Sequence, residues 1–212
     1  MKLAIYKRKL FNNIPQFMLL PYKLLRILYW YIKNDCSLPA PHFIKQAVLQ
    51  RNSPENSIWV ETGTYLGDTT KFLSSNFPYV HTIEPSDFYI KIAKSLIKDS
   101  RKITFHMGTS EQCFEDICRN LTGDVSFWLD GHFSGGNTYK NDLDTPVKYE
   151  LNILTKYINK FEKVSIFIDD IRCSFNLDKD YPSLNYYVNW ALKNNFKWTI
   201  EHDIFILIKN KN

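Results

Sequence analysis

The sequence lacks the patterns that mark proteins of oxidising compartments. No Cys-x-x-Cys pair occurs among its four cysteines, Cys36, Cys113, Cys118 and Cys173. The N-terminus has no cleavable signal with a small-residue cleavage site. These absences favour reduced thiols in a cytoplasmic protein.

Long apolar runs are missing as well. The most apolar stretch, residues 17–32, is interrupted by Lys23 and Arg26. It therefore does not reach the roughly 20 apolar residues of a membrane-spanning helix. Residues 1–34 carry seven basic side chains and no Asp or Glu. The other 20 of the 27 basic residues lie in residues 35–212, together with all 22 acidic residues, so this part of the chain has a formal charge of −2. The basic character therefore belongs to the N-terminal segment.

Residues 1–41 form a basic, amphipathic helical segment, which Pro39 and Pro41 separate from a main domain at residues 42–212. A chain of 212 residues is long enough for one domain with such an appendage. The segment can cover an apolar face of its own domain or of a second copy in a homodimer. It can also lie in the headgroup region on the inner face of a membrane. The sequence leaves these alternatives open.

From residue 42 onward, short β-branched or aromatic runs alternate with stretches of helical spacing. Strands are predicted at residues 58–60, 79–83, 103–106, 125–129 and 164–168, and apolar spacing predicts a helix over residues 147–161. Such alternation implies a parallel sheet with helices on both faces. Residues 196–201 and 204–208 are too close for an intervening helix and predict an antiparallel hairpin at the edge. The predicted fold class is α/β, a doubly wound, mostly parallel seven-stranded sheet.

The turn after the first predicted strand contains neither Gly-x-Gly-x-x-Gly nor the Lys-Ser or Lys-Thr pair of a nucleoside triphosphate loop. It reads Glu61-x-Gly63-x-x-x-Gly67, in which glycines let the backbone approach a ligand closely. Glu84 ends the second strand, 23 residues after Glu61, where an acid can accept hydrogen bonds from ribose hydroxyls. Each signal alone is weak, since glycines often only form a turn and an acid is often only solvated. Together they indicate a nucleoside-containing cofactor.

Three more carboxylates follow the fourth and fifth strands. Asp130 comes directly after the fourth, and Asp169 with Asp170 after the fifth. At adjacent strand ends these charges would repel one another unless a cation or a bound substrate offset them. Mg²⁺ suits such an all-oxygen site. The alternative is that Asp169 or Asp170 caps the next helix or pairs with Arg172.

The acid-x-Gly-x-x-x-Gly loop, the acid ending strand two and the terminal hairpin resemble the class I S-adenosylmethionine-dependent methyltransferases over residues 55–209. The resemblance implies a Rossmann-like methyltransferase fold, with the ribose held by Glu84. It also implies contacts to adenine from the turn after strand three, where this chain has no Asp. The further cofactor contacts implied by the resemblance are Glu61, Gly63, Thr64, Tyr65, Gly67, Thr109, Ser110 and Asp130.

The Asp130-Gly131-His132 turn and the Asp169-Asp170 pair resemble the metal-dependent sugar O-methyltransferases of the macrocin and novobiocin type. That resemblance implies Mg²⁺ ligation by Asp130, Asp169 and Asp170. It places His132 as the base, where the family has Asp. A histidine keeps the role chemically plausible because its unperturbed pKa is about 6.5. Asp130 and His132 are thus the candidate catalytic residues, in an Mg²⁺-assisted methylation of a hydroxyl on a sugar or polysaccharide precursor.

Two alternatives stay open. In one, His132 and Asp130 act without metal on a nitrogen or oxygen of a small molecule. In the other, the chain is a peripheral membrane or scaffold module whose cofactor pocket is vestigial. A nucleic-acid substrate is disfavoured because the main domain is slightly acidic and its motif regions lack clustered Lys and Arg.

Overall fold

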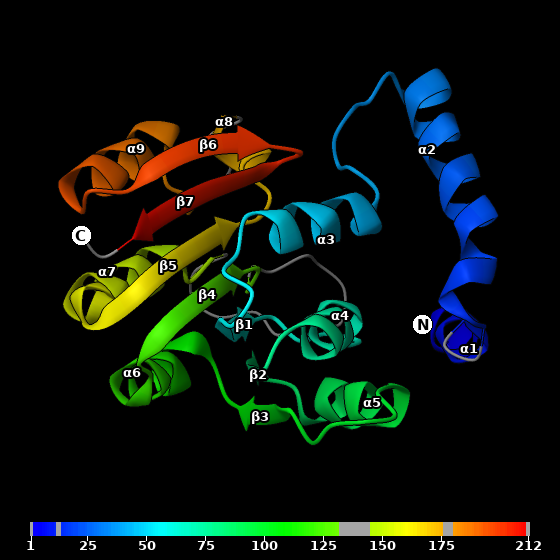
Figure 1. The fold of residues 1–212 in the computed structure, drawn as a ribbon, viewed down its shortest axis with the longest axis horizontal. Helices are drawn as coiled ribbons and strands as arrows, with labels where there is room; N and C mark the ends of the chain where they lie inside the picture. The colour runs from blue at the N-terminus through cyan, green and yellow to red at the C-terminus, as the bar shows by residue number, and fades with distance from the viewer. Residues whose placement is uncertain (1, 12–13, 132–144, 176–179, 211–212) are drawn as a thin grey trace.

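A computed structural model describes residues 2–11, 14–131, 145–175 and 180–210. Its centre is a seven-stranded sheet in the order β3-β2-β1-β4-β5-β7-β6 (Figure 1). All neighbours pair in parallel except β7, which is antiparallel to both β5 and β6. The predicted fold class is confirmed. The strands are β1 (Ile58–Thr62), β2 (Tyr79–Glu84), β3 (Ile103–Met107), β4 (Gly123–Leu129), β5 (Phe161–Ile168), β6 (Lys197–Glu201) and β7 (Ile204–Asn210).

Helices lie on both faces of this sheet (Figure 1). In the main domain, those longer than one turn are α3 (His42–Arg51), α4 (Asp68–Asn76), α5 (Asp87–Leu96), α6 (Ser110–Asn120), α7 (Val147–Tyr157) and α9 (Leu184–Lys193). Two short helices, η2 (Ile158–Lys160) and α8 (Arg172–Phe175), flank β5. The helix expected over residues 147–161 was too long. Phe161 already belongs to β5, where it is buried against Phe127, so the same core accounts for its apolar spacing.

The alternation of side chains along the strands divides the core in two. Val60 of β1 lies in a cluster with Phe127 and residues of α6, α7 and α9. Its neighbour Trp59 points to the other face, where it packs with Trp128 and with residues of α3 and α4. Both faces of the central strands are therefore buried, as expected for a parallel sheet between two helical layers.

The strand order reverses between β1 and β4, which are the central pair. Chain connections leave these two strands in opposite directions, so their carboxyl ends flank the crevice in which doubly wound sheets bind ligands. At the far edge, His202 and Asp203 join β6 to β7 with positive φ angles of 48° and 73°. The predicted terminal hairpin is thus confirmed, and its turn lies at the same end of the sheet as the carboxyl end of β5.

The N-terminal segment contains α1 (Lys2–Phe11), η1 (Gln16–Leu19) and α2 (Leu20–Asn34), which stand beside the main domain (Figure 1). Arg8 of α1 pairs with Asp68 at 2.6 Å, at the start of α4. At the other end, the buried ring of Trp30 lies 5.7 Å from the ring of His202. No helix in the described residues is long and apolar enough to span a membrane.

Candidate functional site

The turn after β1 is forced against the turn after β4. Gly63 has a φ of +89°, and a Cβ there would lie 2.4 Å from the carbonyl oxygen of Asp130. Its amide donates to the carbonyl of Ile83 at 3.0 Å, which ties the same turn to β2. Only glycine satisfies both the angle and the close approach. The residues predicted from three separate strand ends therefore meet at one edge.

Glu61 is buried beneath this turn, with 1% of its surface exposed. The hydroxyls of Thr70 and Thr82 donate to its Oε2 at 2.5 and 2.7 Å. Its Oε1 is buried with no hydrogen-bond partner in the described part of the chain. Burial raises the pKa of Glu61 to about 8, and the nearby Asp130 charge adds to the shift. The site thus holds a protonatable carboxyl group with one open acceptor position.

Glu84 lies at the end of β2 with 6% of its surface exposed. The amides of Tyr65 and Ser86 donate to its two carboxylate oxygens at 2.9 and 3.0 Å. Burial raises the pKa of Glu84, while these two hydrogen bonds oppose the rise. Within the described part of the chain each oxygen accepts one hydrogen bond, so the carboxylate keeps lone pairs for hydroxyl donors. Binding of ribose hydroxyls by Glu84 stays a prediction.

The other predicted residues of the glycine loop make contacts that hold the loop in place. Gly67 has a φ of +78° and precedes α4, with Ala93 close beside it. The hydroxyl of Thr64 shares a hydrogen bond of 2.5 Å with that of Thr82. Tyr65 is 45% exposed, and its ring lies 4.8 Å from the ring of Tyr89. Tyr65 is therefore the loop side chain with the most surface available to a ligand.

After β3, Thr109 forms a capping box with Gln112 at the start of α6. The buried hydroxyl of Ser110 donates to Glu150 of α7 at 2.6 Å. Burial raises the pKa of Glu150 to about 7. Thr109 and Ser110 thus have clear structural roles, and their predicted contact with adenine stays a prediction.

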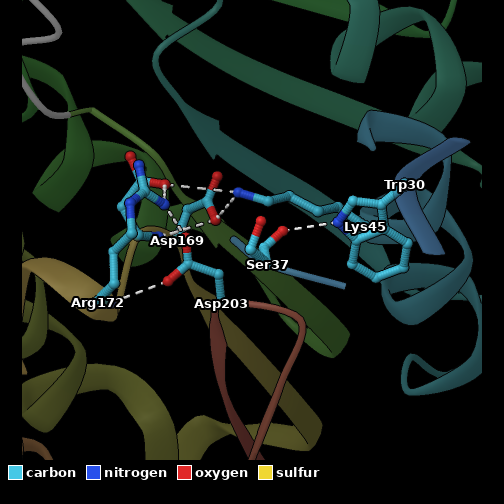
Figure 2. Close-up of polar contacts among 7 residues, drawn as sticks. Trp30, Ser37, Lys45, Asp169, Arg172 and Asp203 are labelled. Atoms are coloured by element: carbon cyan, nitrogen blue, oxygen red, sulfur yellow. Dashed lines mark hydrogen bonds and ion pairs between the residues drawn. The ribbon is translucent and has the colours of Figure 1, made fainter. Parts of the chain in front are cut away.

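The carboxylates after β5 are already paired with cations. Figure 2 shows the Lys45 ammonium reaching Asp169, and Lys45 also lies 3.5 Å from Asp170. Arg172 pairs with Asp170 at 2.6 Å and with Asp203 from the β6–β7 turn. The alternative that Asp170 pairs with Arg172 is confirmed.

These carboxylates can be tested against the predicted metal. One oxygen each from Asp169, Asp170 and Asp203 lie within 4.8 Å of one another, a donor set suited to a hard cation. However, Lys45 pairs with Asp169, and Arg172 pairs with Asp170 and Asp203. These two cations already offset the negative charge of the three carboxylates. A divalent ion would have to displace these pairs. As described, the cluster does not fit the metal, and ligation by Asp130, Asp169 and Asp170 stays a prediction.

The charge of Asp130 nonetheless reaches the acids of the neighbouring strands. It contributes to the raised pKa values of Glu61 and of Asp169, and burial is the larger cause for both. The pKa of Asp169 rises to about 7 although Lys45 opposes the rise. The amide of Asp130 donates to the carbonyl of Thr62 at 3.2 Å, which fixes the turn. His132 lies outside the described residues.

The sequence did not point to Lys45 or Asp203. Lys45 is only 7% exposed and comes from α3, 124 residues before Asp169. The sequence predicts Asp203 only as part of a hairpin turn. A buried lysine on an otherwise apolar helix face has no local signature, because its partner is supplied by the fold.

No protein-family model matches the sequence, and no curated protein sequence matches it significantly. Solved structures do match. An O-methyltransferase from Bacillus cereus in complex with SAH has a TM-score of 0.56 and 14% identity, covering 89% of this chain and 90% of that one. A provisionally assigned O-methyltransferase from Klebsiella pneumoniae scores 0.54 at 12% identity, covering 99% and 89%.

A third structure, the precorrin-6y C5,15-methyltransferase of Geobacter metallireducens GS-15, scores 0.52 at 11% identity and covers 78% of this chain and 87% of that one. Identities this low establish the fold alone. The strand order and the antiparallel β7 agree with it. The chain therefore has the fold of the class I S-adenosylmethionine-dependent methyltransferases.

Proposed function

We propose that this protein is an S-adenosylmethionine-dependent O-methyltransferase acting on a small polar acceptor, a hydroxyl of a sugar or polysaccharide precursor. The observation that carries the proposal is the pair of buried acids at the carboxyl ends of β1 and β2. Glu61 leaves one oxygen without a partner in the described part of the chain, and both oxygens of Glu84 keep lone pairs. A bound nucleoside with an amino-acid tail satisfies both needs.

The cofactor would be held by its two polar ends. The free Oε1 of Glu61 suits the ammonium group of the methionine part, and Glu84 suits the ribose hydroxyls. Gly63 keeps the floor of the site at backbone level, because any side chain there would collide with Asp130. When bound, S-adenosylmethionine supplies an electrophilic methyl group.

On the acceptor side, the protein must orient a hydroxyl and remove its proton. Asp130 stands at the centre of the carboxyl edge, and His132 follows it by two residues, so the proposed base remains His132. We leave Mg²⁺ out of the mechanism because Lys45 and Arg172 already pair with the carboxylates of the β5 side. The two cations hold Asp169 and Asp170 in place and offset their charge.

Calorimetry with S-adenosylhomocysteine on the full chain tests the cofactor part. Binding should be weakened at least about tenfold by Glu84→Ala, since hydrogen bonds to a charged group contribute about 1.5–3 kcal/mol each. Glu162→Ala, an exposed acid on β5, is the matched control and should bind normally. Absence of binding by the unmodified protein would refute the proposal and favour the scaffold alternative.

Methyl transfer is tested by release of S-adenosylhomocysteine with a panel of sugars and nucleotide sugars. His132→Ala should abolish most turnover and leave cofactor affinity nearly unchanged. Excess EDTA should leave activity intact. Loss of activity in EDTA, restored by Mg²⁺, would return the metal to the mechanism and contradict the assignment of Lys45 as the balancing cation.

A further inference from the structure

We propose that the outward face of the N-terminal helices docks on an anionic lipid bilayer. This face is made of large apolar side chains that the protein leaves in solvent. On α1 and α2 their exposed fractions run from 47% to 69%. The residues are Leu3, Tyr6, Leu10, Tyr22, Leu25, Leu28, Tyr29 and Ile32.

The exposed face lies opposite the side that meets the main domain. On α2, the less exposed positions Lys23, Ile27 and Trp30 recur at intervals of four and three. Leu25 and Ile32, seven residues apart, lie on the reverse side of the helix. The helix therefore has one narrow covered stripe, and its exposed apolar side chains extend from Leu24 and Tyr31, beside that stripe, round to the reverse side.

The same division holds on α1. Arg8 and Ile5 lie three residues apart and face the main domain, through the ion pair with Asp68 and the cluster around Leu66. Leu3, Tyr6 and Leu10 are left on the exposed side (Figure 1 shows α1 at the foot of α2). Both helices therefore turn apolar side chains away from the domain.

Charge decides what covers this face. Residues 1–34 carry seven basic side chains and no acidic one. Arg8 and Lys23 lie on the side that meets the main domain, whereas Arg26 and Lys33 are exposed beside the apolar side chains of α2. Two copies packed face to face would bring two such segments together, with no acid to offset the repulsion. An anionic headgroup layer offsets these charges while the apolar side chains enter the acyl boundary. Exposed tyrosines such as Tyr22 and Tyr29 suit that boundary.

The segment is joined to the main domain at the carboxyl edge of the sheet. Arg8 contacts the start of α4 beside the cofactor loop, and Trp30 contacts the turn that carries Asp203. Docking would turn this edge toward the bilayer. If the proposed function holds, on which this last inference rests, docking directs methyl transfer to an acceptor held at the membrane surface.

Flotation of the full chain with vesicles tests the docking without any assay of methyl transfer. Vesicles of phosphatidylcholine alone are compared with vesicles that also contain phosphatidylglycerol. The protein should float with the anionic vesicles, stay unbound with the neutral ones, and be released by raised salt. The Arg26→Glu, Lys33→Glu variant should bind at least about tenfold more weakly, since each basic residue near an anionic surface contributes about 1 kcal/mol. Lys193→Glu, Lys197→Glu makes the same charge change on exposed residues of α9 and β6 and should bind normally.

The apolar contribution has a matched pair of variants. Leu25 is 66% exposed on α2 and Leu192 is 62% exposed on α9. Leu25→Asp should abolish flotation and Leu192→Asp should not, and both should retain S-adenosylhomocysteine binding if the proposed function holds. Circular dichroism checks the fold independently of that function.

The docking proposal would be overturned if Leu25→Asp floated as well as Leu192→Asp, or if the two charge-reversal variants bound vesicles equally. It would also be overturned if the unmodified protein floated equally with neutral and anionic vesicles, or did not float at all. A homodimer that Leu25→Asp dissociates, with no vesicle binding, would assign the face to a second copy instead. If the unmodified protein did not bind S-adenosylhomocysteine, the proposed function would be refuted, whereas the conclusion from vesicle flotation would still hold.

Discussion

Replacing Glu61 by Gln removes a titrating group from the proposed cofactor site and keeps the shape of the side chain. The pKa of Glu61 is raised to about 8 by burial. At pH 7, roughly nine in ten of these carboxyls therefore carry a proton in the free protein. An ammonium group at the free Oε1 would favour the carboxylate, so binding should expel that proton.

The size of the effect follows from this pKa. Binding of S-adenosylhomocysteine at pH 7 should release close to one proton. The affinity for S-adenosylhomocysteine should fall nearly tenfold for each pH unit below pH 7, because binding releases a proton from Glu61 and a higher proton concentration opposes that release. Glu61→Gln should release correspondingly less and bind about 10–150-fold more weakly, the equivalent of about 1.5–3 kcal/mol for a lost charged hydrogen bond.

Calorimetry in phosphate and in Tris measures the proton count directly, since the two buffers differ in ionisation enthalpy. Glu162→Gln, an exposed acid on β5, is the control and should match the unmodified protein. The reasoning fails if Glu61→Gln releases as many protons as the unmodified protein, or if the unmodified protein releases none.

Three further predictions concern stability. Gly63→Ala should lower the free energy of unfolding by about 2–4 kcal/mol, because the alanine must hold a positive φ and its Cβ would meet the carbonyl oxygen of Asp130. Gly123→Ala also requires a positive φ, of +78°, but its Cβ would have nothing within 4 Å, so it should lower that free energy by only about 1 kcal/mol. Urea titration of both variants checks the difference, and equal losses would contradict the close approach. Lys45→Met should destabilise the fold by about 3–5 kcal/mol at pH 8, because the variant lacks the cation that favours the carboxylate form of Asp169. The loss should be smaller at pH 5.5, where the protonated form of Asp169 needs no cation, and a loss independent of pH would assign Lys45 a packing role alone. Because burial raises the pKa values of Glu61 and Asp169 above their unfolded values, the folded state holds more protons, so their contributions to the free energy of unfolding should fall as the pH rises from about 4.5 to 8. Unfolding at several pH values checks this, and Glu61→Gln should reduce the slope.

Much of the architecture could be predicted because its signals are local. The alternation along β1, with Trp59 and Val60 on opposite faces, gives a strand buried on both sides. His202 and Asp203 leave room only for a tight turn between two strand-like runs. The sequence also indicated that Glu61 lies near the end of the first strand, although β1 runs two residues beyond the predicted 58–60, to Thr62.

Contacts between distant segments were decided by the tertiary structure. Lys45 meets Asp169 across 124 residues because α3 packs beside β5, and nothing near either residue encodes that meeting. Ser110 turns its hydroxyl to Glu150 because α6 and α7 share one face of the sheet. The bare side of α2 follows in the same way, since periodicity marks a helix as amphipathic but only packing decides which apolar side chains are covered. Local pattern fixes the elements, whereas sheet order and register fix their partners.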